Sequence, residues 1–124
     1  MSLIPFSLKH GLIKSDQLTL TIENSTVIGL NGKNKSLIKD LEYHFEKHPN
    51  NRVIEEVGLG KNFGITQLRA LNTAFEERHC GLHLGFGGRE KGSHHLDFIF
   101  QGGQIYFDEN LIFDEKYLIP LRSF

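Results

Sequence analysis

The chain has 124 residues, a length typical of one domain, with 39% hydrophobic and 23% charged residues. Its 14 basic and 15 acidic residues give a net charge of -1, so no basic excess favours binding to nucleic acid or to an anionic membrane. Cys80 is the only cysteine, which excludes an intrachain disulfide and favours a reducing compartment. We find no signal-peptide pattern and no run near the roughly 20 apolar residues of a membrane span, and therefore expect a cytoplasmic protein.

Alternating apolar residues predict a β-hairpin in the N-terminal part of the chain. Residues 17–22 alternate with a period of two, as in a half-buried strand, and residues 26–30 continue as the second strand. Glu23-Asn24-Ser25 supplies the turn between them.

Helical spacing follows the hairpin. Ser36 is the expected N-cap of a first helix, and Pro49-Asn50-Asn51 is its expected end. The apolar residues of this helix lie on one face: Leu37, Ile38, Leu41 and Phe45. The same spacing predicts a second amphipathic helix at Ile65, Leu68, Leu71 and Phe75.

Strand patterns return on both sides of the second predicted helix. We expect strands over residues 52–60, 82–87 and 96–100, and a final hairpin from residues 104–107 and 110–113. Together these elements predict an α+β fold, in which an N-terminal hairpin and two helices pack with a mixed β-sheet. We expect one domain that spans residues 1–124, because no linker or repeat divides the chain.

Polar residues inside apolar strands predict a functional site. His95 and Asp97 are two residues apart on one predicted strand, so both side chains lie on the same face. His83 lies in a second apolar strand and Glu56 in a third. Buried charges need partners, and imidazoles and carboxylates are common ligands of divalent metal ions. We therefore predict that these four residues form one metal site.

Each of these residues also has a purely structural interpretation. A histidine in a strand is most often a hydrogen-bonded part of the core, and Asp97 is compatible with a turn cap or a lysine pair. His44 and His48 have the i,i+4 spacing of a zinc pair, but such a pair is more often solvent-exposed. His94 is expected on the outer side of its strand. The glycines in residues 85–88 lack the context of a dinucleotide site, and indicate a close approach of backbone to a metal or substrate.

Three segments carry a family resemblance. They are Glu-Val-Gly-Leu-Gly-Lys-Asn at residues 56–62, Glu76 followed by Gly-Leu-His-Leu-Gly-Phe-Gly at residues 81–87, and His-Leu-Asp at residues 95–97. In this order they resemble the thermophilic aminopeptidase T family and the related dihydroxypyridine dioxygenases. The family's large N-terminal domain has no counterpart here, so the resemblance implies a reduced catalytic domain.

The resemblance implies two metal centres as alternatives. As in the aminopeptidases, Glu56, His83, His95 and Asp97 would bind two divalent ions such as zinc, cobalt or manganese, and Glu76 would be the catalytic general base. As in the dioxygenases, His83, His95 and Asp97 would hold a single iron, the two-histidine-one-carboxylate arrangement of non-haem iron oxygenases.

Three functions follow from these expectations. The first is a metallo-aminopeptidase-like hydrolase that acts on a peptide or small-molecule substrate. The second is a mononuclear non-haem iron oxygenase, and the third is a non-catalytic peptide-binding accessory module. We also expect a homodimer, or a partner protein that completes the site, because a sheet without its neighbouring domain exposes an apolar face or edge.

Overall fold

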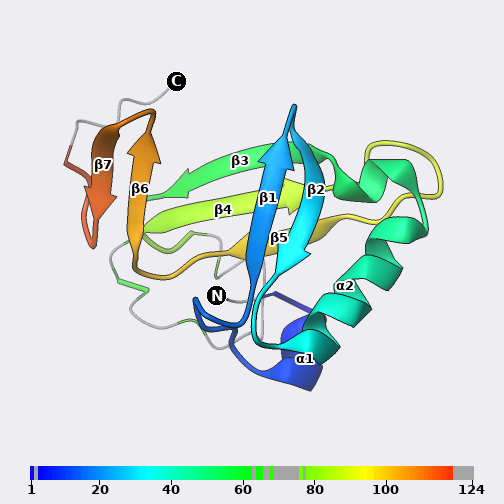
Figure 1. Ribbon diagram of the computed structural model, residues 1–124. Coiled ribbons are helices and arrows are strands. Elements are labelled where there is room, and N and C mark those ends of the chain that lie inside the picture. Colours follow the sequence, from blue (N-terminus) through cyan, green and yellow to red (C-terminus); the bar gives the residue numbers. More distant parts are fainter. Residues whose placement is uncertain (2, 63, 66–67, 69–75, 77, 119–124) are drawn as a thin grey trace.

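The computed structural model describes residues 1, 3–62, 64, 65, 68, 76 and 78–118. Within them the chain combines helices and strands, which confirms the predicted α+β class (Figure 1). In chain order the elements are α1 (Phe6–His10), β1 (Thr19–Glu23), β2 (Thr26–Asn31), α2 (Lys35–Glu46), the 3-10 helix η1 (Pro49–Arg52), β3 (Ile54–Gly60), β4 (Gly81–Phe86), β5 (Leu96–Ile99), β6 (Gln104–Phe107) and β7 (Asn110–Asp114).

The described strands form three antiparallel sheets, where the sequence predicts one mixed sheet. The sheets are β1-β2, β3-β4-β5 and β6-β7. The β1-β2 and β6-β7 sheets are hairpins, in which a short turn joins two antiparallel strands. Asn24 and Ser25 both have positive φ (51° and 60°), which gives the first turn the left-handed backbone that matches strand twist. The hairpins at both ends of the chain confirm the prediction.

The helix predicted after the first hairpin is α2, but its N-cap is Asn34 and not Ser36. The side-chain oxygen of Asn34 accepts a hydrogen bond from the backbone N–H of Leu37 at 3.0 Å. The predicted apolar face is confirmed, because its residues are all buried: Leu37, Ile38, Leu41 and Phe45.

The second predicted helix lies outside the described residues, since Leu71 and Phe75 are not among them. The short helix α1 was not predicted; its Phe6 packs against the core. In the described part of the chain, no helix is long and apolar enough to span a membrane.

The core lies between one face of the β3-β4-β5 sheet and the layer formed by α2 and the β1-β2 hairpin. Phe86 is central to it: its ring centroid is 5.0 Å from that of Phe98 on β5 and 6.3 Å from that of Phe45 on α2. Side chains alternate along a strand, so His83 and Gly85 of β4 point to the face opposite Leu84 and Phe86. In Figure 1 the β1-β2 hairpin crosses one face of the sheet, and His83 and Gly85 point to the other face.

Candidate metal centre

Three of the predicted site residues meet on the sheet face opposite the core. Glu56 on β3 and Asp97 on β5 both pair with Gly85 of the central strand β4. A Cβ atom at Gly85 would lie 2.5 Å from Cε1 of His95 and 3.1 Å from Oδ1 of Asp97. The missing side chain at Gly85 therefore makes the space in which the imidazole and the two carboxylates converge.

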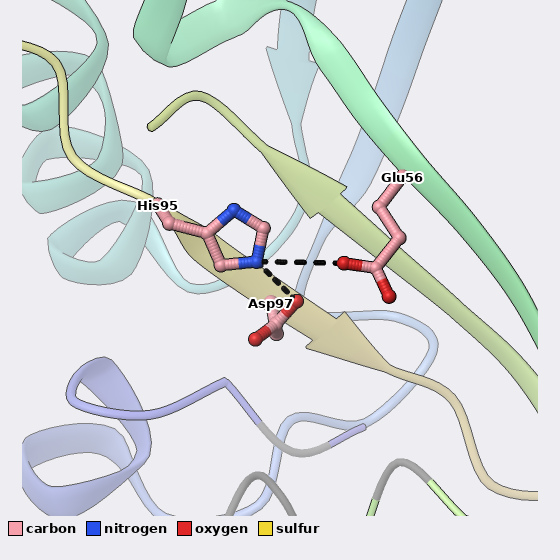
Figure 2. Close-up of side chains that lie close together, drawn as sticks. All are labelled: Glu56, His95 and Asp97. Carbon is pink, nitrogen blue, oxygen red and sulfur yellow. Dashed lines mark hydrogen bonds and ion pairs between the residues drawn. The ribbon is translucent and has the colours of Figure 1, made fainter. Parts of the chain in front are cut away.

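The three side chains of this group lie close enough together to share one metal ion. Nε2 of His95 is 2.8 Å from Oδ1 of Asp97 and 3.9 Å from Oε2 of Glu56 (Figure 2). One ligand atom from each residue lies within 4.8 Å of the others. Tetrahedral bonds of about 2.1 Å place ligand atoms about 3.4 Å apart, so small side-chain rotations are enough to fit an ion.

The group is open to solvent on one side. The side chains of Glu56 and His95 are 48% and 42% exposed, whereas that of Asp97 is 12% exposed. The side chain of Asp97 is thus mostly buried, whereas the side chains of Glu56 and His95 face solvent. Such a site has room for a water molecule or a substrate beside the protein ligands.

Both ring nitrogens of His95 face oxygen atoms. Nδ1 lies 3.1 Å from the carbonyl oxygen of Gly87, and Nε2 faces the carboxylates of Asp97 and Glu56. A neutral imidazole has only one N–H. When Nδ1 donates to Gly87, Nε2 presents a lone pair to two negatively charged groups. A cation at Nε2, either a proton or a metal ion, removes this repulsion.

The pKa of His95 reflects the same field. Burial lowers this pKa, but the hydrogen bond to the Gly87 carbonyl and the charges of Asp97 and Glu56 together outweigh burial, and the net pKa is raised. The site therefore favours positive charge at Nε2. A proton and a metal ion would compete for that position.

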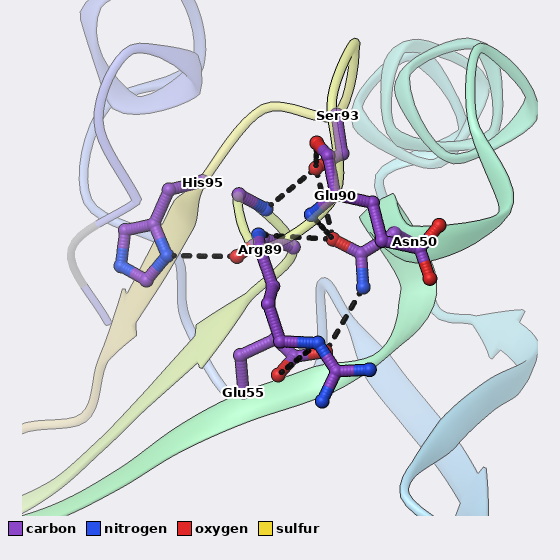
Figure 3. A network of polar contacts seen from close by, with 8 residues as sticks. Asn50, Glu55, Arg89, Glu90, Ser93 and His95 are labelled. Atoms are coloured by element: carbon purple, nitrogen blue, oxygen red, sulfur yellow. Dashed lines mark hydrogen bonds and ion pairs between the residues drawn. The ribbon is translucent and has the colours of Figure 1, made fainter.

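A buried asparagine of η1 holds the loop that precedes His95 (Figure 3). Asn50 is 3% exposed, and its Oδ1 accepts hydrogen bonds from the backbone N–H groups of Arg89 (3.1 Å) and Glu90 (3.2 Å). The hydroxyl oxygen of Ser93 lies 2.8 Å from the same Oδ1. On the other side, Nδ2 of Asn50 donates to Glu55 at 2.9 Å. One side chain thus joins the β4–β5 loop to the start of β3.

The neighbouring asparagine fixes the end of the same loop. Asn51 is 0% exposed; its Oδ1 accepts from the backbone N–H of His94 at 2.8 Å, and its Nδ2 donates to the carbonyl of His44 at 2.9 Å. The two asparagines therefore position the loop whose Gly87 carbonyl orients the His95 ring. Sequence reasoning assigned them only to the end of a helix; the one signal was a polar pair placed directly before a strand.

His83 contacts the group through Glu56. Its Nε2 is 2.9 Å from Oε1 of Glu56, and its side chain is 10% exposed. Gly58 pairs with His83 across β3 and β4, and a Cβ atom at Gly58 would overlap the His83 ring. Glu56 thus turns one oxygen toward each histidine. In this position His83 orients the Glu56 carboxylate, and its direct ligation of a metal stays a prediction.

The remaining candidates have structural contacts. Glu76, the predicted general base, is buried, and its main-chain carbonyl accepts from the backbone N–H of His79 at 3.1 Å; its catalytic role stays a prediction. Nδ1 of His48 accepts from the backbone of η1, and His44 packs edge-on against Phe6. His94 is exposed, as predicted.

Comparison of the chain with protein-family models gave no match, and neither the curated proteins nor the solved structures gave a significant one. The resemblance to the aminopeptidase T family therefore rests on the three motifs, and membership of that family stays a prediction.

Proposed function

We propose that this chain binds a divalent transition-metal ion through Glu56, His95 and Asp97. One observation carries the proposal: Nε2 of His95 faces two carboxylates while Nδ1 faces the carbonyl oxygen of Gly87. A divalent ion at Nε2 replaces the repulsion between these acceptors by three favourable bonds. One imidazole and two carboxylates form a donor set suited to zinc, manganese and related ions.

The proposed activity is metal-dependent hydrolysis of a peptide or another acyl compound. Three protein ligands with open positions are the arrangement of catalytic zinc sites, whereas structural zinc sites are closed by four. When bound, such an ion lowers the pKa of a coordinated water and polarises a carbonyl. In this chain His83 orients Glu56, and the loop held by Asn50 orients the His95 ring. The aminopeptidase-like motifs support the same reaction class.

Metal content tests the proposal. The protein would be purified without added metal and analysed by elemental mass spectrometry, both as isolated and after dialysis against zinc and then against buffer. We expect one bound zinc, cobalt or manganese ion per chain in the unmodified protein. His95→Ala and Asp97→Ala should lose the ion. His94→Ala is the matched control and should keep it, because His94 is an exposed histidine next to the site.

The other outcomes separate the alternatives. One iron per chain would favour a mononuclear oxygenase-type centre, with His83 as a second imidazole ligand. If the unmodified protein holds no metal after zinc dialysis, the proposal is contradicted, and the non-catalytic peptide-binding module is the remaining alternative. Equal metal content in the His94 and His95 variants would place the ion elsewhere.

A further inference from the structure

A pocket adjoins the candidate metal centre. It lies between α1, α2 and residues 94–96, and its volume is about 510 Å³. Of the three proposed ligands, His95 belongs to its lining and Glu56 and Asp97 do not, so the pocket and the proposed metal site share one residue. Sites for small molecules commonly have volumes of about 300–1,000 Å³. The pocket is therefore large enough for a bulky side chain next to the metal centre.

The walls of the pocket are apolar and aromatic. Pro5 and Phe6 line it at the start of α1, Tyr43 lines it on α2, and Leu96 lines it on β5. The Phe6 ring meets the His44 ring at 82° with a centroid separation of 5.8 Å, which fixes this wall. Tyr43 is 67% exposed, so much of its side chain is open to solvent at the pocket. Aromatic rings at a pocket wall favour apolar and aromatic groups.

The charged groups of the pocket favour an anion. The ammonium of Lys47 lies 4.6 Å from the centroid of the Tyr43 ring. The carboxylate of Asp40 is already engaged, with Lys9 Nζ at 2.9 Å and His10 Nε2 at 2.7 Å. A positive charge thus stands on an apolar wall, while the negative charge of the pocket is compensated. A ligand carboxylate would be attracted to Lys47 and to a divalent ion at His95.

We propose that this pocket binds the bulky apolar group of a carboxylate ligand whose carboxylate lies at the metal centre. The inference rests on the proposed metal site and adds its substrate class: carboxylates, including peptide ends, that carry a large apolar or aromatic side chain. The apolar walls select the side chain by burial, and Lys47 and the metal select the charge.

Two probe acids test the inference. 3-Phenylpropionate and acetate share a carboxylate and differ in the apolar group, and each would be titrated by NMR into zinc-loaded and zinc-free protein. With zinc, we expect phenylpropionate to bind at least about tenfold more tightly than acetate and to shift the amide signals of Tyr43, Lys47 and Leu96. Without zinc, the same signals should shift at higher concentration.

A pair of tyrosine variants provides the control. Tyr43→Ala should remove most of the preference for phenylpropionate, whereas Tyr106→Ala should keep it, because Tyr106 is similarly exposed (53%) but lies on β6. Zinc binding with no preference for phenylpropionate, or with no shift at these pocket residues, would overturn the inference alone. Pocket shifts in a protein that binds no zinc would overturn the metal site alone.

Discussion

The space above Gly85 decides whether an imidazole and two carboxylates come together. A Cβ atom there would lie 2.5 Å from Cε1 and 3.0 Å from Nε2 of His95. Since the ring is the end of a side chain, Gly85→Ala should displace it and leave the strands paired. We expect metal affinity to fall by at least about tenfold, with little change in melting temperature. Calorimetric zinc titration and thermal unfolding measure the two effects.

Gly29→Ala is the control for that substitution. Gly29 also lies in a strand, and a Cβ atom there would be 3.7 Å from its nearest neighbour, an ordinary contact. An unchanged zinc affinity in Gly85→Ala would contradict the arrangement in Figure 2.

Asn50 acts on the site without contacting it. Asn50→Ala removes the acceptor of two part-buried hydrogen bonds, from the N–H groups of Arg89 and Glu90, which should cost about 1–3 kcal/mol of stability. Because the same loop presents the Gly87 carbonyl to His95, we expect zinc affinity to fall about 10- to 100-fold. Denaturant unfolding and zinc titration check both expectations.

A variant that only lowers stability separates these effects. Asn34→Ala removes a helix cap that lies far from the loop in the chain, so zinc affinity should stay within about twofold of the unmodified protein. Equal losses of affinity in the Asn34 and Asn50 variants would mean that Asn50 supports only the fold.

At the scale of single residues the sequence predicts part of the site. The period of two along a strand places His95 beside Asp97, and the structure confirms their contact, although His95 lies one residue before β5 and not on it. The period does not predict that Glu56 stands between His83 and His95, because this depends on the register of β3 against β4, which shifts between Ile54 and Glu56. The role of Asn50 cannot be predicted from local sequence patterns either, because its hydrogen-bond partners lie about 40 residues later in the chain.

At the scale of elements, two residues near the start of α2 are suitable N-caps, and the structure uses only one of them. Asparagine and serine are both good N-caps, so sequence reasoning assigned the cap to Ser36, whereas the structure assigns it to Asn34. Asn34→Ala should therefore lower the free energy of unfolding by about 1 kcal/mol, and Ser36→Ala should change it by less than about 0.5 kcal/mol. Urea denaturation of both variants measures the difference. A larger loss for Ser36→Ala would contradict the observed cap.

The histidine of α2 should make stability depend on pH. Burial, and then the charges of Lys47 and His94, lower the pKa of His44 below its ordinary value of 6.5. The unfolded chain therefore binds the proton more readily than the folded chain, and stability falls as the pH drops below about 6.5 toward the folded-state pKa. His44→Leu removes this proton uptake, so its stability should fall less steeply between pH 7.5 and 5.

Urea denaturation at several pH values measures that slope. Tyr43→Leu, at the adjacent position of α2, is the control, because it also replaces a ring by leucine and leaves His44 in place. Parallel pH profiles for the His44 variant and the unmodified protein would show that His44 is protonated alike in both states.

At the scale of the whole molecule, the sequence predicts the elements better than their assembly. Local alternation predicts both hairpins, and helical spacing predicts the buried face of α2. The division of the described strands into three sheets cannot be predicted from local patterns, because it depends on which strand edges meet in space. The sequence also does not show that one sheet face packs on α2 while the other collects the candidate ligands, which is the property that makes a site.

The most direct test of the central claim is the position of a bound ion. Crystals of the protein grown with zinc would be measured at the zinc absorption edge, and the anomalous signal would locate the metal. We predict one peak about 2.0–2.1 Å from Nε2 of His95 and bonded to an oxygen of Asp97 and an oxygen of Glu56. A map with no peak between these residues, or with zinc only at other histidines such as His48, would contradict the account.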